Sequence, residues 1–225
     1  MKKFLLILLL VTMSFIGFAY EGKLNNLETA LKLASLEKKT AIIMFSDKSC
    51  YYCNVFNEKT LTDKNVQQLL KAGYTFIEIY KGKENVDLVL NGETKTYTYS
   101  ELYSVFGISG TPTLWFLNSA GNPITNLPGY VPADMFVKVL QYLGEEAYRQ
   151  EIIFESYSKQ EHDYIGDSQI ITLNSEKANY VLDNDPLAKK YKGDFDRFTI
   201  WIVEDENTAN TLIEKSAFRV ILIKG

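Results

Sequence analysis

The sequence has few residues that could bind a metal ion or cross-link a small domain, with two cysteines and one histidine among its 225 residues. Two cysteines cannot form the disulfide framework of a small secreted scaffold, and a chain of this length with 46% apolar residues can bury a core without one. Cys50 and Cys53 have the spacing of half a zinc site. Zinc would need two further ligands, and outside this pair the chain offers His162 alone. We therefore expect no metal site and no cofactor.

The sequence also lacks an excess of positive charge and a long apolar run. Its 24 basic and 28 acidic side chains give a net charge of −4, which argues against nucleic acid as a partner. The apolar run Phe4–Phe18 is shorter than the roughly 20 residues that span a bilayer. It follows Lys2-Lys3 and ends at Gly17-Phe18-Ala19, the pattern of a signal peptide. We expect cleavage after Ala19, a periplasmic or secreted location and no stable membrane insertion after cleavage, with an uncleaved anchor as the alternative.

The sequence does contain one reactive motif, the segment Cys50-Tyr51-Tyr52-Cys53, which comes shortly after the apolar run Thr40–Phe45. The run predicts a buried strand, and residues 50–61 are predicted to be helical. Cys50 would then lie at a helix N-terminus, where unpaired backbone N–H groups and the helix dipole stabilise a thiolate. Cys53 would lie one turn further along the same face, close enough to form a disulfide. The spacing predicts a dithiol–disulfide exchange site, with a purely structural disulfide as the alternative.

The chain up to Leu143 alternates predicted helices and strands. Apolar spacing and capping signals predict further helices at 27–36, 62–71, 98–106 and 132–143. Strands are predicted at 41–45, 74–80, 113–117 and 124–127, and the residues of 74–80 alternate as those of a half-exposed strand do. Asn91-Gly92, between the segments 86–90 and 93–97, predicts a hairpin with a two-residue turn.

This order of elements, with Thr111-Pro112 just before a strand, resembles the thioredoxin fold over residues 24–143. The run Ser104–Phe116 and the segment Leu127-Pro128-Gly129-Tyr130 are similar to the SoxW-like branch of periplasmic thioredoxins. The hairpin before Thr98 also fits that branch. The resemblance implies an α/β protein with a thioredoxin-like fold, in which a central mixed sheet is flanked by helices.

The resemblance also implies roles for individual residues. Cys50 would be the attacking thiol and Cys53 the resolving thiol. Pro112 would be a cis-proline beside them, a rare and therefore meaningful conformation. The backbone of Thr111 would then pair with an extended substrate segment in the manner of an added strand.

The sequence departs from ordinary thioredoxin around the cysteines. Ser49 stands where thioredoxin has tryptophan, and Tyr51-Tyr52 replaces Gly-Pro. Met44 stands where thioredoxin buries an aspartate that helps to deprotonate the resolving cysteine. Glu78 or a water could serve instead, and the sequence leaves that choice open. Tyr51 and Tyr52, together with Tyr130, are the aromatic residues that we expect to touch a substrate.

Beyond the resemblance, a second unit is predicted. We place the thioredoxin-like domain at 20–148, a polar linker at 149–167, in which His162 is expected to be solvated, and a small α/β domain at 168–225. Apolar runs at 169–173, 198–203 and 219–223, with helical patterns at 175–182 and 207–215, predict a βαβαβ unit with a parallel sheet. Residues 200–224 resemble the end of rhodanese-like domains, but the loop Glu204-Asp205-Glu206 has no cysteine for their sulfur chemistry.

Taken together, the residues and the resemblance predict an exported thiol–disulfide oxidoreductase that exchanges disulfides with partner proteins through Cys50 and Cys53. The resemblance favours a reductase that receives electrons from a membrane partner. The alternative is a non-catalytic binding module in which the thioredoxin-like unit holds a partner and the disulfide is structural.

Overall fold

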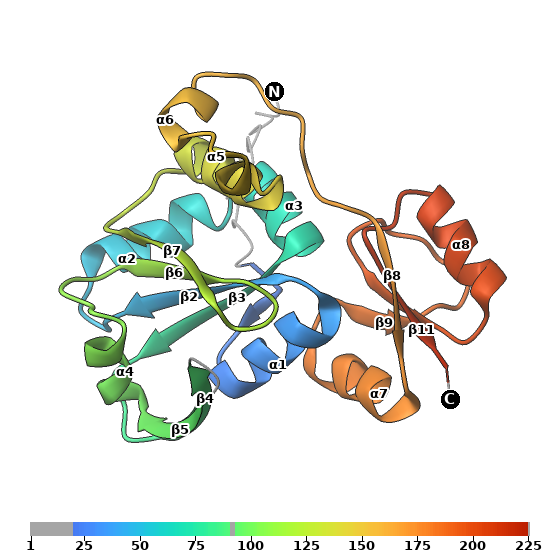
Figure 1. Cartoon of the computed structure of the whole chain (residues 1–225), viewed down its shortest axis with the longest axis horizontal. Coiled ribbons are helices and arrows are strands. Elements are labelled where there is room, and N and C mark those ends of the chain that lie inside the picture. The colour runs from blue at the N-terminus through green and yellow to red at the C-terminus, as the bar shows by residue number, and fades with distance from the viewer. Residues whose placement is uncertain (1–19, 91–92, 225) are drawn as a thin grey trace, which may run out of the picture.

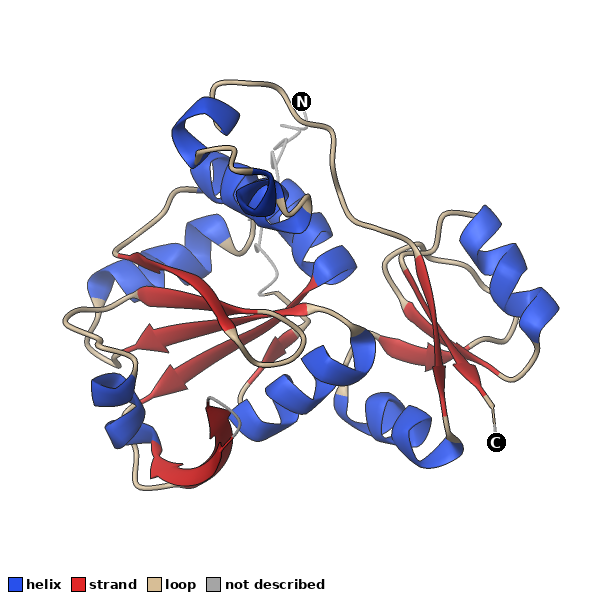
Figure 2. Cartoon of the chain, in the orientation of Figure 1, coloured by secondary structure: helices blue, strands red, loops and turns tan. Residues whose placement is uncertain are grey.

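The computed structural model describes residues 20–90 and 93–224, which form two units that lie side by side (Figure 1). The first unit is built around a five-stranded sheet with a separate two-stranded hairpin, and the second around a four-stranded sheet (Figure 2). In this part of the chain, no helix has both the length and the apolar character needed to cross a membrane. The α/β fold class predicted from the sequence is confirmed.

The predicted helices and strands occur in the predicted order, and four short elements at 23–24, 147–150, 154–157 and 188–190 were not predicted. The helices are α1 (Leu27–Glu37), α2 (Tyr51–Val55), α3 (Lys64–Gly73), α4 (Tyr99–Val105), α5 (Ala133–Gly144), α6 (Phe154–Tyr157), α7 (Ser175–Asn184) and α8 (Glu206–Glu214), with a π-helix η1 (Phe56–Thr60) and a 3-10 helix η2 (Ala147–Gln150). The strands are β1 (Lys23–Leu24), β2 (Thr40–Ser46), β3 (Tyr74–Tyr80), β4 (Asn85–Leu90), β5 (Glu93–Thr98), β6 (Thr113–Leu117), β7 (Pro123–Pro128), β8 (Gln169–Leu173), β9 (Ala188–Lys190), β10 (Ile200–Val203) and β11 (Arg219–Ile223).

The first sheet is mixed and has the strand order β1-β3-β2-β6-β7. Strands β1, β3 and β2 are parallel, whereas β6 is antiparallel to both β2 and β7. Helices α2, α3 and α5 cover one face, and α1, α4 and the β4–β5 hairpin cover the other. Each face therefore has its own apolar core, and the central strand β2 is buried on both sides.

Strand β3 corrects one sequence prediction. Its residues 74–80 were expected to be half exposed, but all of them except Tyr80 are buried. The reason is that β3 lies between β1 and β2 and is covered by helices on both faces. Glu78 is therefore a buried carboxyl group.

The hairpin and the helix after it form as their local signals predict. Strands β4 and β5 pair in the register Asn85↔Thr98 to Leu90↔Glu93, and the predicted turn at Asn91-Gly92 lies outside the described residues. Thr98 and Glu101 form a capping box at the start of α4, in which each side chain accepts a hydrogen bond from the other residue's backbone N–H.

The segment between the two units packs against α5. His162, expected to be solvated, is largely covered and stacks on Tyr157 with ring centroids 3.5 Å apart. Gln141 in α5 donates hydrogen bonds to the backbone oxygens of His162 and Tyr164, at 2.9 and 3.1 Å. The Gln141 contacts join residues 21 and 23 positions apart, which explains why the local polar pattern gave no sign of them.

The second unit has a parallel sheet, as predicted, in the order β8-β11-β10-β9. Helix α7 packs on one face and α8 on the other. The short strand β9 was not predicted, because two of its three residues are exposed lysines and it has no apolar run of its own. Strand β10 begins at Ile200, two residues later than predicted.

The two units share a buried junction. Leu33 in α1 is fully buried and belongs to the core cluster formed by α7, β9, β10 and β11. Arg219 in β11 donates a hydrogen bond of 3.0 Å to the backbone oxygen of Ala72, near the C-terminal end of α3. Glu37 and Lys39 form an ion pair of 3.0 Å that is also buried. The second unit is thus packed against the helices of the first.

Candidate redox site

The candidate site lies where β2 leads into α2, and its two cysteines form a disulfide. The Cα atoms of Cys50 and Cys53 are 5.3 Å apart. Cys50 is the N-cap of α2, and the backbone N–H of Cys53 donates to the Cys50 sulfur at 3.1 Å. η1 continues α2 directly, so the helical segment runs to Thr60. The structure therefore places Cys50 at a helix N-terminus, as the sequence predicted.

The two cysteines differ in their exposure. Cys50 is half-buried, whereas Cys53 is only 1% exposed and belongs to the core of the first unit. A partner can therefore reach the sulfur of Cys50 from outside, while the sulfur of Cys53 faces the interior. This asymmetry fits an attacking and a resolving role, respectively.

A groove of about 340 Å³ opens beside Cys50. Its lining residues come from the β2–α2 loop, the start of α2, the end of β3, α4 and the loop before β6: Asp47, Ser49, Cys50, Tyr51, Tyr52, Lys81, Tyr103, Ile108, Ser109, Gly110 and Thr111. It thus brings together Cys50, Tyr51, Tyr52 and Thr111 of the predicted site residues. Pro112 is not in the lining; it is buried next to Thr111, and the bond between them is cis.

The loop that carries Thr111 and Pro112 is held in place by hydrogen bonds to its backbone oxygens. The Thr113 hydroxyl donates to the backbone oxygen of Gly110 at 2.8 Å. The backbone N–H of Gly129 donates to the backbone oxygen of Pro112 at 2.7 Å, and Gly129 has a positive φ of 89° that favours glycine. The wall of the groove opposite α2 is therefore a fixed backbone surface.

Charged groups also line the groove. Asp47 accepts hydrogen bonds from the hydroxyl and the backbone N–H of Ser49, at 2.6 and 2.9 Å, and these bonds lower the pKa of the carboxyl. The ammonium of Lys81 lies 5.2 Å from the centre of the Tyr103 ring. The Tyr103 hydroxyl donates to the backbone oxygen of Ser46 at 2.5 Å, and burial raises the Tyr103 pKa to about 12.

Below α2 lies a polar network that sequence reasoning largely missed. Glu78 is 5% exposed and pairs with Lys23 at 2.8 Å. The amide of Asn57 in η1 donates to both Glu78 oxygens at 3.2 Å and to the backbone oxygen of Cys53 at 3.1 Å. Glu78 is also the neighbour of Met44 across the β2–β3 pair. Burial works to raise the Glu78 pKa, but hydrogen bonding to Lys23, Ser46 and Tyr80 and the charge of Lys23 together outweigh burial, so the pKa lies below its usual value.

The sequence contained only weak signals for this network. Glu78 was considered as a proton acceptor, but nothing identified Lys23 or Asn57 as its partners. Lys23 lies in a strand of two residues whose pairing with β3 brings it near Glu78. Asn57 lies four residues after Cys53, the spacing of helical neighbours, and this was the one local signal that could have indicated it.

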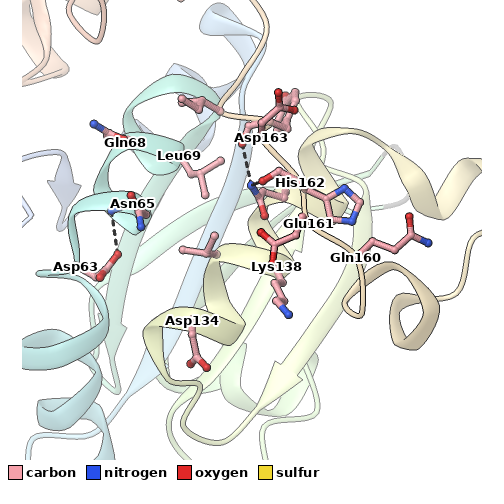
Figure 3. Close-up of a pocket in the computed structure, with 14 residues that line it drawn as sticks. Asp63, Asn65, Gln68, Leu69, Asp134, Lys138, Gln160, Glu161, His162 and Asp163 are labelled. Atoms are coloured by element: carbon pink, nitrogen blue, oxygen red, sulfur yellow. Dashed lines mark hydrogen bonds between the residues drawn. The ribbon is translucent and has the colours of Figure 1, made fainter.

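A second groove, of about 450 Å³, lies away from the cysteines, between α3, α5 and the segment 160–165 (Figure 3). Asp63, which caps α3, lies at one side of it, and His162 at the other. The backbone of this segment is held to α5 by Gln141. The groove contains none of the residues predicted to carry chemistry. Among the described residues, no cluster of three or more histidine, cysteine or acidic side chains could hold a metal ion.

Comparison with known families assigns the first unit. The model of a family described as a thioredoxin-like domain matches residues 27–144, slightly more than half of the chain. The chain therefore belongs to the thioredoxin-like domain family. The match does not extend into the second unit, and the SoxW-like branch remains a prediction.

A comparison with curated proteins finds no match. Among solved structures, the chain is similar to a thioredoxin-fold protein from Helicobacter pylori, with 19% identity and a TM-score of 0.51, over 60% of this chain and 96% of that one. It is also similar to a thioredoxin from Thermus thermophilus, with 22% identity and a TM-score of 0.45, over 62% of this chain and 96% of that one. The first likeness supports the thioredoxin fold.

Proposed function

We propose that the chain is a thiol–disulfide oxidoreductase that acts on partner proteins. The thiolate of Cys50 attacks one sulfur of a partner disulfide, which forms a mixed disulfide and releases the other partner sulfur as a thiolate. Cys53 then loses its proton and attacks the sulfur of Cys50, which releases the second partner thiolate and closes the Cys50–Cys53 disulfide. Two electrons pass to the partner, whose two thiolates take up protons. The same steps in reverse oxidise a partner.

The observation that carries this proposal is the environment of Cys50. Its sulfur accepts the backbone N–H of Cys53 at the start of a helical segment, and that contact would stabilise the thiolate in the reduced protein. The sulfur also borders an open groove, while Cys53 lies in the core. A disulfide that only held the fold together would need neither the groove nor the helix N-terminus.

Glu78 is proposed as the group that receives the Cys53 proton. It is a buried carboxylate on the face of the sheet that α2 covers, and Asn57 links it to the backbone of Cys53. Met44 cannot take a proton, and its cross-strand neighbour Glu78 can. The Lys23 ammonium keeps Glu78 ionised and therefore able to accept the proton.

Trapping experiments test the roles of the two cysteines. Cys53→Ser should accumulate mixed disulfides with partner proteins, because the resolving thiol is gone, whereas Cys50→Ser should accumulate none. Both variants would be expressed in the same cells, quenched with acid and compared on non-reducing gels. Equal trapping by both variants, or by neither, would overturn the assignment.

We also propose that the chain is exported after cleavage behind Ala19, and that it works as a reductase supplied with electrons by a membrane partner. A reduction potential of the Cys50–Cys53 pair near about −270 mV supports the reductase, and a value near about −120 mV supports an oxidant. Mass spectrometry of the protein recovered outside the cytoplasm tests the export proposal, which requires Tyr20 as the first residue.

The second candidate function is a binding module with a structural disulfide. The observation that favours it is the exposure of Tyr51 and Tyr52 beside the cysteines, since exposed aromatic residues are typical of binding surfaces. The pKa of Cys50, followed by the ultraviolet absorbance of its thiolate, separates the two functions. A value well below the ordinary thiol value of about 8.5 favours the oxidoreductase.

A further inference from the structure

Two aromatic side chains beside Cys50 are unusually exposed. Tyr51 is 72% exposed and Tyr52 is 57% exposed, and both line the redox groove together with Cys50. Among the described residues, Tyr51 is the most exposed large apolar side chain. Large apolar groups that stand in water next to a reactive atom indicate a surface that a partner covers.

The two rings belong to an ordered surface that includes a third tyrosine. Tyr51 and Tyr52 meet edge to face with ring centroids 5.3 Å apart, and Tyr52 stacks on Tyr130 at 6.2 Å. We call Tyr51, Tyr52 and Tyr130 the tyrosine surface. It extends from the start of α2 to the loop between β7 and α5, and is continuous with the groove.

The loop that carries Tyr130 is fixed on both sides. The backbone N–H of Gly129 donates to Pro112, and the hydroxyl of Thr60 donates to the backbone oxygen of Val131 at 2.8 Å. Tyr130 itself packs against the core of the first unit. The Tyr130 ring, and the Tyr52 ring that stacks on it, therefore need little ordering when a partner binds, and this preorganisation favours affinity.

The groove charges indicate which side chain the surface accepts. Tyrosine rings can attract a cation or an uncharged apolar group. Lys81 already places a positive charge in the groove, and the carboxylate of Asp47 already accepts two hydrogen bonds from Ser49. Both hydrogen bonds from Ser49 go to one Asp47 oxygen, and the negative charge of Asp47 is offset by the nearby Lys81 ammonium. The two charges leave the groove with little net attraction for a cationic side chain, whereas the exposed rings can still contact an uncharged aromatic side chain.

We propose that the tyrosine surface selects partner segments in which an aromatic residue adjoins the reactive cysteine. This proposal rests on the proposed function, because it describes what the same site exchanges with. An extended segment that runs through the groove would place its cysteine on Cys50 and the adjoining side chain on the rings of Tyr51 and Tyr52. Small disulfides without such a side chain would react without this contribution.

Matched peptides test the proposal on the full chain in its reduced form. Each peptide carries one cysteine as a mixed disulfide with thionitrobenzoate, and the residue before the cysteine is tyrosine, serine or arginine. Attack by Cys50 on the peptide sulfur releases coloured thionitrobenzoate, and Cys53 then releases the peptide thiol. For each protein variant, the rate constant for each peptide is divided by that variant's rate constant for bis(2-hydroxyethyl) disulfide, so that differences in Cys50 reactivity between variants cancel.

The tyrosine peptide should react about three- to tenfold faster than the serine peptide, in line with one or two aromatic contacts. Tyr52→Ala and Tyr130→Ala should bring this ratio close to one, and Tyr52→Phe should preserve it. Phe195→Ser is the matched control, because Phe195 is also an exposed aromatic residue but lies in the second unit; it should leave the ratio unchanged.

Other outcomes overturn the proposal in distinguishable ways. A tyrosine-to-serine rate ratio near one in the unmodified protein, with normal reaction of the small disulfide, would contradict the proposed specificity but not the proposed oxidoreductase activity. A preference for the arginine peptide assigns the surface to cations instead. A dimer in sedimentation that Tyr52→Ala dissociates assigns it to a second copy of the chain. No reaction with any disulfide removes the proposed function itself.

Discussion

At the scale of single residues, the proposed exchange site is distinguished by one buried charge, which lies on β3 and not on β2. The side chain of Met44 beneath α2 is apolar, and the carboxylate comes from Glu78 on the neighbouring strand. A buried carboxylate needs partners to remain ionised, and Lys23 and Asn57 provide them. Because Asn57 also holds the backbone of Cys53, the same residues that stabilise the charge connect it to the site.

Glu78→Gln should affect both stability and exchange. Since the Glu78 pKa is lowered in the folded state, its stabilising effect is present at neutral pH and is lost as the pH falls through that lowered pKa. The variant should lose about 1–2 kcal/mol of unfolding free energy at pH 7, and the difference should shrink in acid. Urea unfolding across the pH range measures this.

The exchange step provides the second measurement on Glu78→Gln. Resolution of a preformed mixed disulfide by Cys53 should slow at neutral pH and become more dependent on hydroxide, because the proton acceptor is missing. Glu84→Gln is the control, since Glu84 is exposed and lies near the end of the same strand. A pH profile of resolution that matches the unmodified protein would show that Glu78 only supports the fold.

At the scale of elements, one wall of the groove beside Cys50 comes from a short helix that starts at a capping box. Helix α4 has seven residues, too few to be stable alone, and begins with the capping box of Thr98 and Glu101. It carries Tyr103, whose hydroxyl reaches the backbone of β2 and of β3. The cap therefore helps to position one wall of the groove.

Thr98→Ala should lower the unfolding free energy by about 1 kcal/mol, because the backbone N–H of Glu101 loses its acceptor. Thr98→Ser keeps the hydroxyl and should lose much less. Denaturant unfolding of the two variants decides the point. Equal destabilisation by alanine and serine would mean that Thr98 stabilises the protein through its methyl group and not through the cap hydrogen bond.

At the scale of the whole molecule, the two units meet through a junction that is both apolar and charged. Leu33 supplies the apolar contact, while Glu37 and Lys39 lie buried close to Asp185 of the second unit. Such a junction couples the units, because separating them would expose apolar surface and break the contacts of buried polar groups.

The two tryptophans allow this coupling to be measured, since Trp115 lies in the first unit and Trp201 in the second. Trp115→Phe and Trp201→Phe each leave one unit with a fluorescent reporter. Leu33→Ala should cost about 2–5 kcal/mol and lower the unfolding midpoint of both reporters together. Leu31→Ala is the control, because Leu31 packs against the first unit only. A shift of the first-unit reporter alone would show that the units unfold independently.

The titratable group at the junction, Glu37, predicts a pH dependence of stability. Burial is the main influence on the Glu37 carboxyl and raises its pKa to about 8; Lys39 opposes this and Asp185 adds to it. In the unfolded chain the group ionises near its ordinary value, so between about pH 5 and 8 the folded state holds a proton that the unfolded state has lost. The stability from this group is therefore complete in mild acid and is lost as the pH rises toward 8.

Glu37→Gln removes the titrating group. The unfolding free energy of this variant should therefore fall less between pH 5 and 8 than that of the unmodified protein. The difference in slope can reach about 1.4 kcal/mol per pH unit. Glu28→Gln, an exposed change in the same helix, should leave the slope as it is. Parallel curves for Glu37→Gln and the unmodified protein would show that Glu37 is already ionised in the fold.

The sequence by itself determined the thioredoxin-like order of elements and the placement of Cys50 at a helix start. These depend on local signals: apolar runs, capping residues and the spacing of the two cysteines. The tertiary structure alone decided that Glu78 is buried, that Lys23 and Asn57 hold it, and that Leu33 packs against the second unit. The physical reason is that these contacts join residues 21 to 150 or more positions apart, and their closeness follows from strand pairing and helix packing, which local periodicity does not encode.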